Sequence, residues 1–276
     1  MLTTLFISVI DNIITIVVTL NLLKVALVQL HLQHGNKTQA LKYLHRMLSR
    51  AAEADADIAC LPELWYPRVI KNFEDDFKTV FDFAKEHNVT IILGAFLEKL
   101  SDGLHVSCPV VAADGTMVGR QLKIHPFGTQ KSYIKGGTQL EVFDSGRFKF
   151  GVLICYDIVF PELARSYVMK GAEILFIPSR IIDIGIKPWH MYIQVRALEN
   201  RVPITAVNVC DKIMTHYGKS ICVDFEYERA SDIALPKLTI ASTRQQVLAV
   251  DVDLKLARKI RNRRFKDFKN DLYESL

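Results

Sequence analysis

The stretch from Phe150 to Arg165, FGVLICYDIVFPELAR, predicts a strand that ends at a cysteine and is followed by a helix. Gly151 to Ile154 is a short apolar run, which is typical of a buried strand, and proline is favoured in the first turn of a helix, so a helix should begin at Pro161. Cys155 lies between them, at the kind of strand end where α/β sheets bind ligands. A helix amino end or a nearby cation would stabilise its thiolate, although a lone cysteine is more often buried and inert.

Two other predicted strands end in charged side chains. The segment 57–67, DIACLPELWYP, is a short apolar strand that is followed by Glu63. The segment 119–128, GRQLKIHPFG, brings Lys123 to the start of a turn-rich loop. A carboxylate, an ammonium and a thiol at three strand ends are the groups that covalent acyl transfer requires.

Together these motifs resemble the nitrilase superfamily, the carbon-nitrogen hydrolases with a Glu-Lys-Cys triad. The family's order and flanking residues are present in LPELWYP, QLKIHPFG and GVLICYDIVFPELAR. The segment 196–201, RALENR, is similar to the family's helix after the cysteine. The similarity extends from about Lys24 to Arg264, and it covers the whole predicted domain.

The resemblance implies an α+β fold, a four-layer αββα sandwich, whose monomers pair as a homodimer or assemble into a higher homo-oligomer. It implies that Glu63 is the general base, that Cys155 is the nucleophile, and that Lys123 stabilises the oxyanion together with the backbone amide of Tyr156. The expected reaction is attack on an amide carbon, release of ammonia or an amine, and hydrolysis of the resulting thioester. Neither a cofactor nor a metal ion is expected.

Some positions depart from the family pattern. Gln130 stands where many relatives have a second glutamate, and it can hydrogen-bond Lys123 but cannot pair with it as a charge. Gln121 and Ser107 also differ from the residues usual there, and the segment 220–246 lacks the usual P-x-G turn. These differences leave the triad intact, but they mean that the family pattern does not identify the substrate.

Three further side chains lie on segments that we expect to face the pocket: Arg180, Trp189 and His190. Arg180 would suit a substrate carboxylate, which favours an omega-amidase or an N-carbamoyl acid hydrolase. Their ordinary roles would be a surface ion pair, core packing and a hydrogen-bonded surface histidine. Two alternative functions remain. The alternative enzyme is a nitrilase acting on small organic nitriles, and the alternative that is not primarily an enzyme is a catalytically weak family member with a binding role.

Composition and cysteine usage narrow the class of protein. The 276 residues are 50% hydrophobic and contain no Pro/Gly/Ser-rich linker, so a single domain is expected at 23–276. The net charge of +5 comes from the segment 255–269, KLARKIRNRRFKDFK, which is typical of a solvated helix face or tail, and no nucleic-acid partner is expected. The five cysteines are widely spaced, which argues against disulfides and structural zinc and favours the cytoplasm.

Residues 1–22, MLTTLFISVIDNIITIVVTLNL, form an atypical apolar extension ahead of this domain. Asp11 and Asn12 interrupt the apolar run, and no Lys or Arg precedes Lys24. Stable membrane insertion and a signal peptide are therefore not expected. Three interpretations of this segment remain: an anchor that associates with a membrane, an extra packed element, or the product of an upstream start site.

From Lys24 onward, strands alternate with helices. Apolar residues at helical spacing predict helices at 38–54, along a phenylalanine-rich stripe at 73–84, and at 188–200. Turn signals at Asp102-Gly103 and Asp114-Gly115 predict hairpins, which excludes a purely parallel sheet. Strands are expected at 24–31, 57–61, 90–97, 106–112, 117–123, 140–144, 148–154, 174–177, 203–209 and 246–252.

Overall fold

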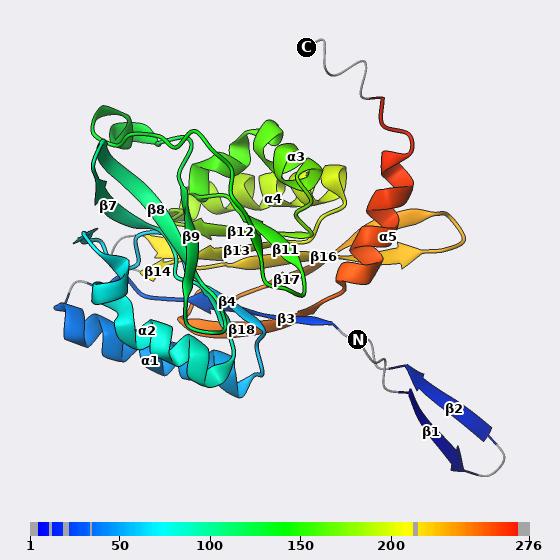
Figure 1. The fold of residues 1–276 in the computed structure, drawn as a ribbon. Helices are drawn as coiled ribbons and strands as arrows, with labels where there is room; N and C mark the ends of the chain where they lie inside the picture. Colours follow the sequence, from blue (N-terminus) through cyan, green and yellow to red (C-terminus); the bar gives the residue numbers. More distant parts are fainter. Residues whose placement is uncertain (1–4, 11–12, 19–21, 34, 212–214, 270–276) are drawn as a thin grey trace.

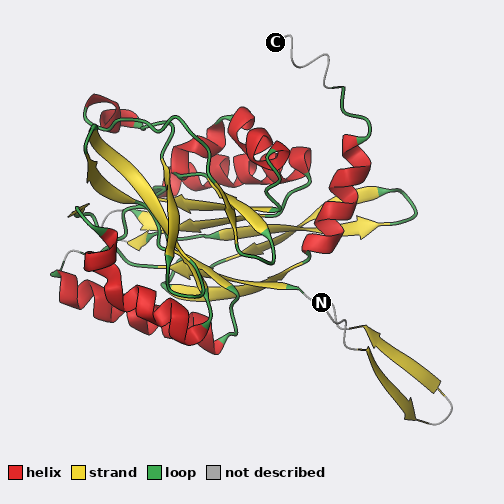
Figure 2. Ribbon diagram, in the orientation of Figure 1, coloured by secondary structure: helices red, strands yellow, loops and turns green. Residues whose placement is uncertain are grey.

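The structure is a computed structural model that describes residues 5–10, 13–18, 22–33, 35–211 and 215–269. Two mixed sheets pack face to face, and helices cover both outer faces (Figures 1 and 2). Helices α1 (Lys37–Glu53) and α2 (Phe73–His87) cover one sheet, and α3 (Pro161–Met169) and α4 (Ile186–Asn200) cover the other. The predicted αββα sandwich is confirmed.

The first sheet has eight strands in the order β18-β3-β4-β6-β8-β7-β5, with β9 paired to β8. Its centre is parallel, and the strands around β8 form the antiparallel hairpins that the turn residues predict. The strand bounds are β3 (Leu23–Gln29), β4 (Ile58–Cys60), β5 (Val69–Ile70), β6 (Thr90–Ile92), β7 (Phe96–Leu100), β8 (Gly103–Val111), β9 (Met117–Leu122) and β18 (Gln246–Val252).

The second sheet has six strands in the order β10-β11-β12-β13-β16-β17, and β11, β12 and β13 are parallel. Helix α5 (Leu254–Phe265) crosses its far end beside β16 (Figure 1). The strand bounds are β10 (Val142–Asp144), β11 (Lys149–Val152), β12 (Ile174–Ser179), β13 (Ile204–Asn208), β16 (Ile221–Glu228) and β17 (Ile233–Ile240). Short pairs also form between β1 (Leu5–Ile10) and β2 (Ile13–Val18), and between β14 (Cys210–Asp211) and β15 (His216–Tyr217).

Three apolar clusters hold the four layers together. On β3, Ala26 and Val28 pack toward α1 and α2, whereas Val25 and Leu27 pack toward the second sheet. This alternation explains why the strand is apolar throughout, since both of its faces are covered. The third cluster lies between the second sheet and the helices α3, α4 and α5.

Most expected elements are present, with ends that differ by a few residues, but two expectations were wrong and one hairpin was not predicted. The strand expected at 90–97 is two strands, because Gly94 adopts a φ of +83° and breaks the run between β6 and β7. The strand before Cys155 ends at Val152, and a 3₁₀ turn, η2 (Cys155–Val159), separates the cysteine from α3. The segment 220–246 contains the antiparallel hairpin of β16 and β17, which the sequence did not reveal.

The strands β1 and β2 pair with each other in a sheet of their own. Asp11 and Asn12, on which the interpretation of the apolar extension rests, lie outside the described residues, as do 1–4 and 19–21. Within the described ranges, no helix has the length and apolar character needed to cross a bilayer.

Candidate active site

Glu63, Lys123 and Cys155 meet at one end of the sandwich, and all three side chains are buried. The Lys123 Nζ donates a hydrogen bond to Glu63 Oε1 at 2.7 Å. Burial and the charge of Glu63 raise the pKa of the Cys155 thiol, and the charge of Lys123 lowers it, so both charged side chains act on the cysteine. The structure therefore brings together the three residues that the strand ends predicted, while their chemical roles stay predictions.

Glu63 is fixed by backbone contacts to both sheets. Its N–H donates to the Ser179 carbonyl at the end of β12 at 3.2 Å, and the next residue, Leu64, donates to Ala95 at 2.7 Å. Leu64 adopts a φ of +49°, so the chain turns sharply directly after the glutamate. This turn holds the carboxylate in the space between the two sheets.

Lys123 follows β9, and its N–H donates to the Val106 carbonyl at 2.8 Å. Gln130, on the 3₁₀ turn η1 (Gly128–Ser132), accepts from Lys123 Nζ at 3.1 Å and from the Phe127 N–H at 3.1 Å. Burial lowers the pKa of Lys123, but the opposing charges of Glu63 and Cys155 outweigh burial and leave the pKa raised. The lysine is therefore a fixed ammonium with two acceptors.

Cys155 occupies the first position of η2 with a φ of +52°, in the left-handed region. Burial and the neighbouring Glu63 raise the pKa of the thiol to about 12, while Lys123 and the backbone N–H of Arg180 act in the opposite direction. The expectation that a helix amino end would stabilise the thiolate was wrong, because α3 begins only at Pro161 and η2 lies between. The resting thiol is protonated and needs a base.

Asp157 is a buried residue of the site that the sequence did not reveal. Its carboxylate accepts from the N–H groups of His125 at 2.8 Å, Ile154 at 3.2 Å and Ile124 at 3.3 Å. Burial raises its pKa despite these hydrogen bonds. Asp157 thus ties the loop after Lys123 to the turn that carries the cysteine. The available signal was an acidic residue three positions after Ile154, the spacing of a side-chain cap.

Arg196, the first residue of RALENR, holds the other end of η2. Its guanidinium donates to the carbonyls of Ile158 at 3.2 Å and Val159 at 2.8 Å. The resemblance pointed to this segment of α4 without giving its contacts. The cysteine turn is therefore held at both ends by buried side chains.

The other predicted residues divide into two groups. Tyr156 is half-buried against Phe127, and the half-buried Arg180 forms no ion pair within the described residues, while its backbone N–H lowers the pKa of the Cys155 thiol. Trp189 packs in the outer apolar cluster, whereas Cys155 belongs to the cluster between the sheets. His190 hydrogen-bonds the Lys219 carbonyl at 2.7 Å in a different cavity. The expectation that Trp189 and His190 face the pocket was therefore wrong.

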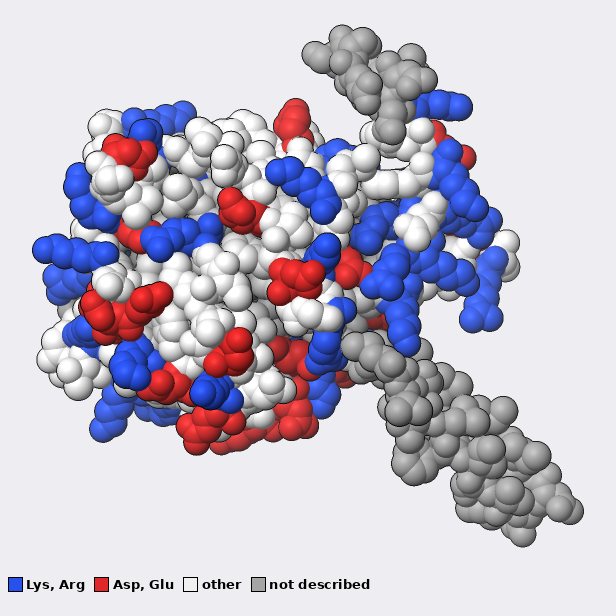
Figure 3. Space-filling model, viewed as in Figure 1, with Lys and Arg blue, Asp and Glu red and all other residues white. Residues whose placement is uncertain are grey.

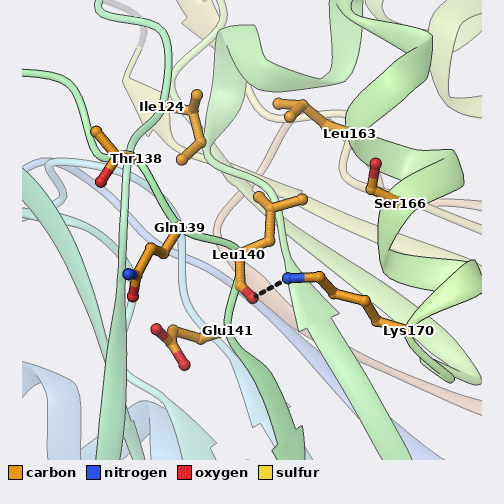
Figure 4. Close-up of a pocket in the computed structure, with 8 residues that line it drawn as sticks. All are labelled: Ile124, Thr138, Gln139, Leu140, Glu141, Leu163, Ser166 and Lys170. Carbon is orange, nitrogen blue, oxygen red and sulfur yellow. Dashed lines mark hydrogen bonds between the residues drawn. The ribbon is translucent and has the colours of Figure 1, made fainter.

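A cavity of about 640 Å³ lies beside the lysine loop, between α3 and the segment 138–141 (Figure 4). Lys170 reaches across it and donates to the Leu140 carbonyl at 3.3 Å. Its lining is Ile124, Thr138, Gln139, Leu140, Glu141, Leu163, Ser166 and Lys170, without any triad residue. In the part of the chain that the structure describes, no three His, Cys, Asp or Glu side chains are placed to hold a metal ion.

Comparison with known proteins assigns the chain to a family. The family model described as carbon-nitrogen hydrolase matches residues 24–262. The chain is 30% identical over 273 residues to a nitrilase of Pyrococcus abyssi, covering 92% of this chain and 97% of that one. It is 28% identical over 275 residues to the omega-amidase of Bos taurus, covering 91% and 96%.

Among solved structures, an amidase of Nesterenkonia sp. AN1 superposes with a TM-score of 0.72 at 18% identity, covering 92% of this chain and 96% of that one. That structure is a glutamate-to-glutamine variant with the acetamide moiety of fluoroacetamide added covalently to its active-site cysteine. The fold, the family match and the full-length relatives agree, and the chain is a carbon-nitrogen hydrolase, a member of the nitrilase superfamily.

Proposed function

We propose that the protein is an amidase that hydrolyses non-peptide carboxamides through a thioester on Cys155. The observation that carries the proposal is the buried ion pair of Glu63 and Lys123, whose two charges both act on the buried thiol of Cys155. A thiol with a pKa of about 12 is a poor nucleophile near neutral pH unless a base removes its proton. Glu63 is the base within reach.

In the proposed reaction, Glu63 accepts the thiol proton while the sulfur of Cys155 attacks the amide carbon. Lys123 and the Tyr156 N–H stabilise the oxyanion, and Glu63 gives its proton to the departing ammonia or amine as the C–N bond breaks. Glu63 then deprotonates a water molecule, which attacks the thioester and releases the acid and the free thiol. The covalent adduct on the active-site cysteine of the Nesterenkonia amidase supports this route by analogy.

The alternative activity is a nitrilase, because the same thiol can attack a nitrile carbon and the relative from P. abyssi is a nitrilase. Ammonia release from a panel of carboxamides and the matching nitriles separates the two. We expect turnover of amides with at most trace turnover of nitriles. Faster hydrolysis of the nitriles would replace the amidase assignment by the nitrilase one.

We assign recognition of a substrate carboxylate to Arg180, which favours an omega-amidase or an N-carbamoyl acid hydrolase. Its guanidinium has no carboxylate partner among the described residues, and its backbone N–H lowers the pKa of the nucleophilic thiol, which places Arg180 beside Cys155. The name of the bovine relative supports an omega-amide substrate. Arg180→Gln should raise KM for an omega-amide acid about tenfold or more and spare a neutral amide. The exposed Arg229→Gln is the control, and an equal loss on both substrates would refute the assignment.

We infer a homodimer formed by the outer face of α4. Large apolar side chains are exposed there, including Met191 at 58% and Val195 at 48%, and Ile240 of β17 continues the surface at 46%. A second copy presenting the same surface would cover them in a two-fold contact. Val195→Glu should convert the dimer into a monomer in light scattering, whereas Val118→Glu, at the same 48% exposure on β9, should not. A monomeric wild type would exclude the dimer.

We place the enzyme in the cytoplasm, with 23–276 as its catalytic domain and 1–22 as an extension. All five cysteines are free in the structure, and a reducing compartment keeps buried thiols free. The proposed chemistry uses only groups of the chain itself and water, so the proposed partners are the small amide substrate and a second copy of the chain.

A further inference from the structure

Three arginines line a small cavity, and all three follow the triad residues at a distance in the sequence. Arg201, Arg263 and Arg264 line a space of about 180 Å³ between the end of α4, the hairpin of β16 and β17, and α5. We call this the arginine pocket; its other lining residues are Tyr227, Asp232, Ala234, Ile260 and Asp267. Figure 3 shows basic side chains gathered over α5 at this side of the molecule.

Most of the hydrogen-bond donors in the arginine pocket have no acceptor among the described residues. A guanidinium carries five N–H donors. Arg201 donates to the Ala234 carbonyl at 3.3 Å, and Arg264 donates to the Leu198 carbonyl at 3.5 Å. The guanidinium of each of these two arginines makes that one hydrogen bond and no ion pair in the described structure. Planar donor groups of this kind match the oxygens of a carboxylate or phosphate.

The carboxylates of the arginine pocket do not balance its cations. Asp232 is paired with Arg263, which also donates to the Tyr227 hydroxyl at 2.9 Å. Asp267 is exposed and forms no ion pair with a described residue. Burial and the like charge of Arg264 lower the pKa of Arg201, which indicates that the two guanidiniums repel each other without a compensating anion.

We propose that the arginine pocket binds a phosphate-type oxyanion, such as inorganic phosphate or the terminal phosphate group of a small molecule. Two guanidiniums from separate elements can each offer a pair of donors to its oxygens, and the volume admits a tetrahedral anion. Bound there, the anion joins the end of α4 to α5 and stabilises the folded chain by mass action. The proposal is independent of the amidase activity.

The test measures melting temperature and calorimetric binding of the full-length chain with inorganic phosphate, against sodium chloride at matched ionic strength. We expect phosphate to raise Tm beyond the chloride control, and Arg201→Gln and Arg264→Gln each to weaken phosphate binding about tenfold. The matched control is Lys259→Gln, which removes one exposed cation of α5 that does not line the arginine pocket and should bind as the wild type does. Asp267→Asn should bind phosphate more tightly, since it removes the nearby unpaired carboxylate.

The proposal would be overturned if phosphate and chloride raised Tm equally, or if Lys259→Gln lost as much phosphate affinity as the two arginine variants. Either result would mean that diffuse surface charge attracts the anion. Circular dichroism of each variant shows that it is folded, and the exposed Arg264 gives a second variant if Arg201→Gln fails to fold. Vesicles that contain phosphatidic acid distinguish the source of the phosphate group. If the protein cosediments with these vesicles and free phosphate prevents it, the ligand is a lipid headgroup. If the protein does not cosediment, the ligand is a soluble phosphate compound.

Discussion

Gln130 stands where a second glutamate is usual, and the structure shows what the amide still does. Its Oε1 accepts from Lys123 Nζ and from the Phe127 N–H, both at 3.1 Å, so the lysine keeps its second acceptor without a second charge. We therefore expect Gln130→Glu to keep its activity within about threefold. Gln130→Leu should lower kcat about tenfold or more, because it removes both bonds and leaves the ammonium less well oriented.

Steady-state kinetics and melting curves of the two Gln130 variants check this prediction. The control is Gln139→Leu, an exposed glutamine in the nearby segment that does not contact Lys123. Unchanged kcat in Gln130→Leu would show that the Glu63 contact alone orients the lysine.

At the residue scale, the sequence predicts the triad because each member sits at the end of a recognisable strand. The role of Asp157 was not predicted because it depends on the N–H groups of Ile124 and His125, some thirty positions away. Only the folded chain brings these groups together. Trp189 and His190 were misplaced because α4 carries apolar side chains on its exposed as well as its buried side, so its sequence does not tell which side meets the site.

At the scale of elements, the break at Gly94 shapes the glutamate's surroundings. Its φ is +83°, and a Cβ there would collide with the Pro62 carbonyl, directly before Glu63. Gly94→Ala should therefore lower the unfolding free energy by about 3 kcal/mol, from backbone strain plus the collision. Gly146→Ala is the matched control, with a φ of +78° and open space, and should cost about 1 kcal/mol.

Urea denaturation of the two glycine variants gives the comparison. Equal losses would mean that the collision with Pro62 is relieved at no cost and that only the positive φ matters. Activity of the folded Gly94→Ala protein should also fall, because Pro62 would have to shift and would carry Glu63 with it.

The element order was predictable because apolar runs of strand length and helical stripes alternate along the chain. Strand ends were less predictable. The run 90–97 is almost entirely apolar, so the sequence does not show the break at Gly94. Because of this break, β8 pairs first with β7 and then with β6. The hairpin of β16 and β17 was missed although Val223 to Glu228 alternate between apolar and charged residues, because Pro236 inside β17 argues against a strand there.

At the scale of the whole molecule, we expect the extension at 1–22 to be separable from the proposed catalytic domain. The family match begins at residue 24, and β1 and β2 pair with each other in a sheet apart from the two large ones. A chain that starts at residue 23 should fold with an unchanged melting temperature and unchanged kcat/KM. Loss of folding in that truncated chain would show that the extension belongs to the core.

The buried thiols make the fold sensitive to alkaline pH. Burial raises the pKa of Cys222 from its ordinary value of 9.0 to about 12, and the pKa values of Cys155 and Cys210 are likewise raised to about 12. Above pH 9 the unfolded chain releases these protons first, so the stabilisation that is complete below that pH is lost as pH rises toward 12. Urea midpoints under reducing conditions should fall over this range, and less steeply in Cys222→Ala. A flat profile would contradict the burial of these thiols.

The central claim is that a nucleophilic sulfur, a base and a fixed cation act together on one carbonyl carbon. Intact mass and peptide mapping after rapid mixing with an amide library and acid quench test it most directly. We expect an acyl adduct on Cys155, absent in Cys155→Ala and strongly reduced in Glu63→Gln. An adduct on another cysteine, or full turnover by Cys155→Ala, would contradict it.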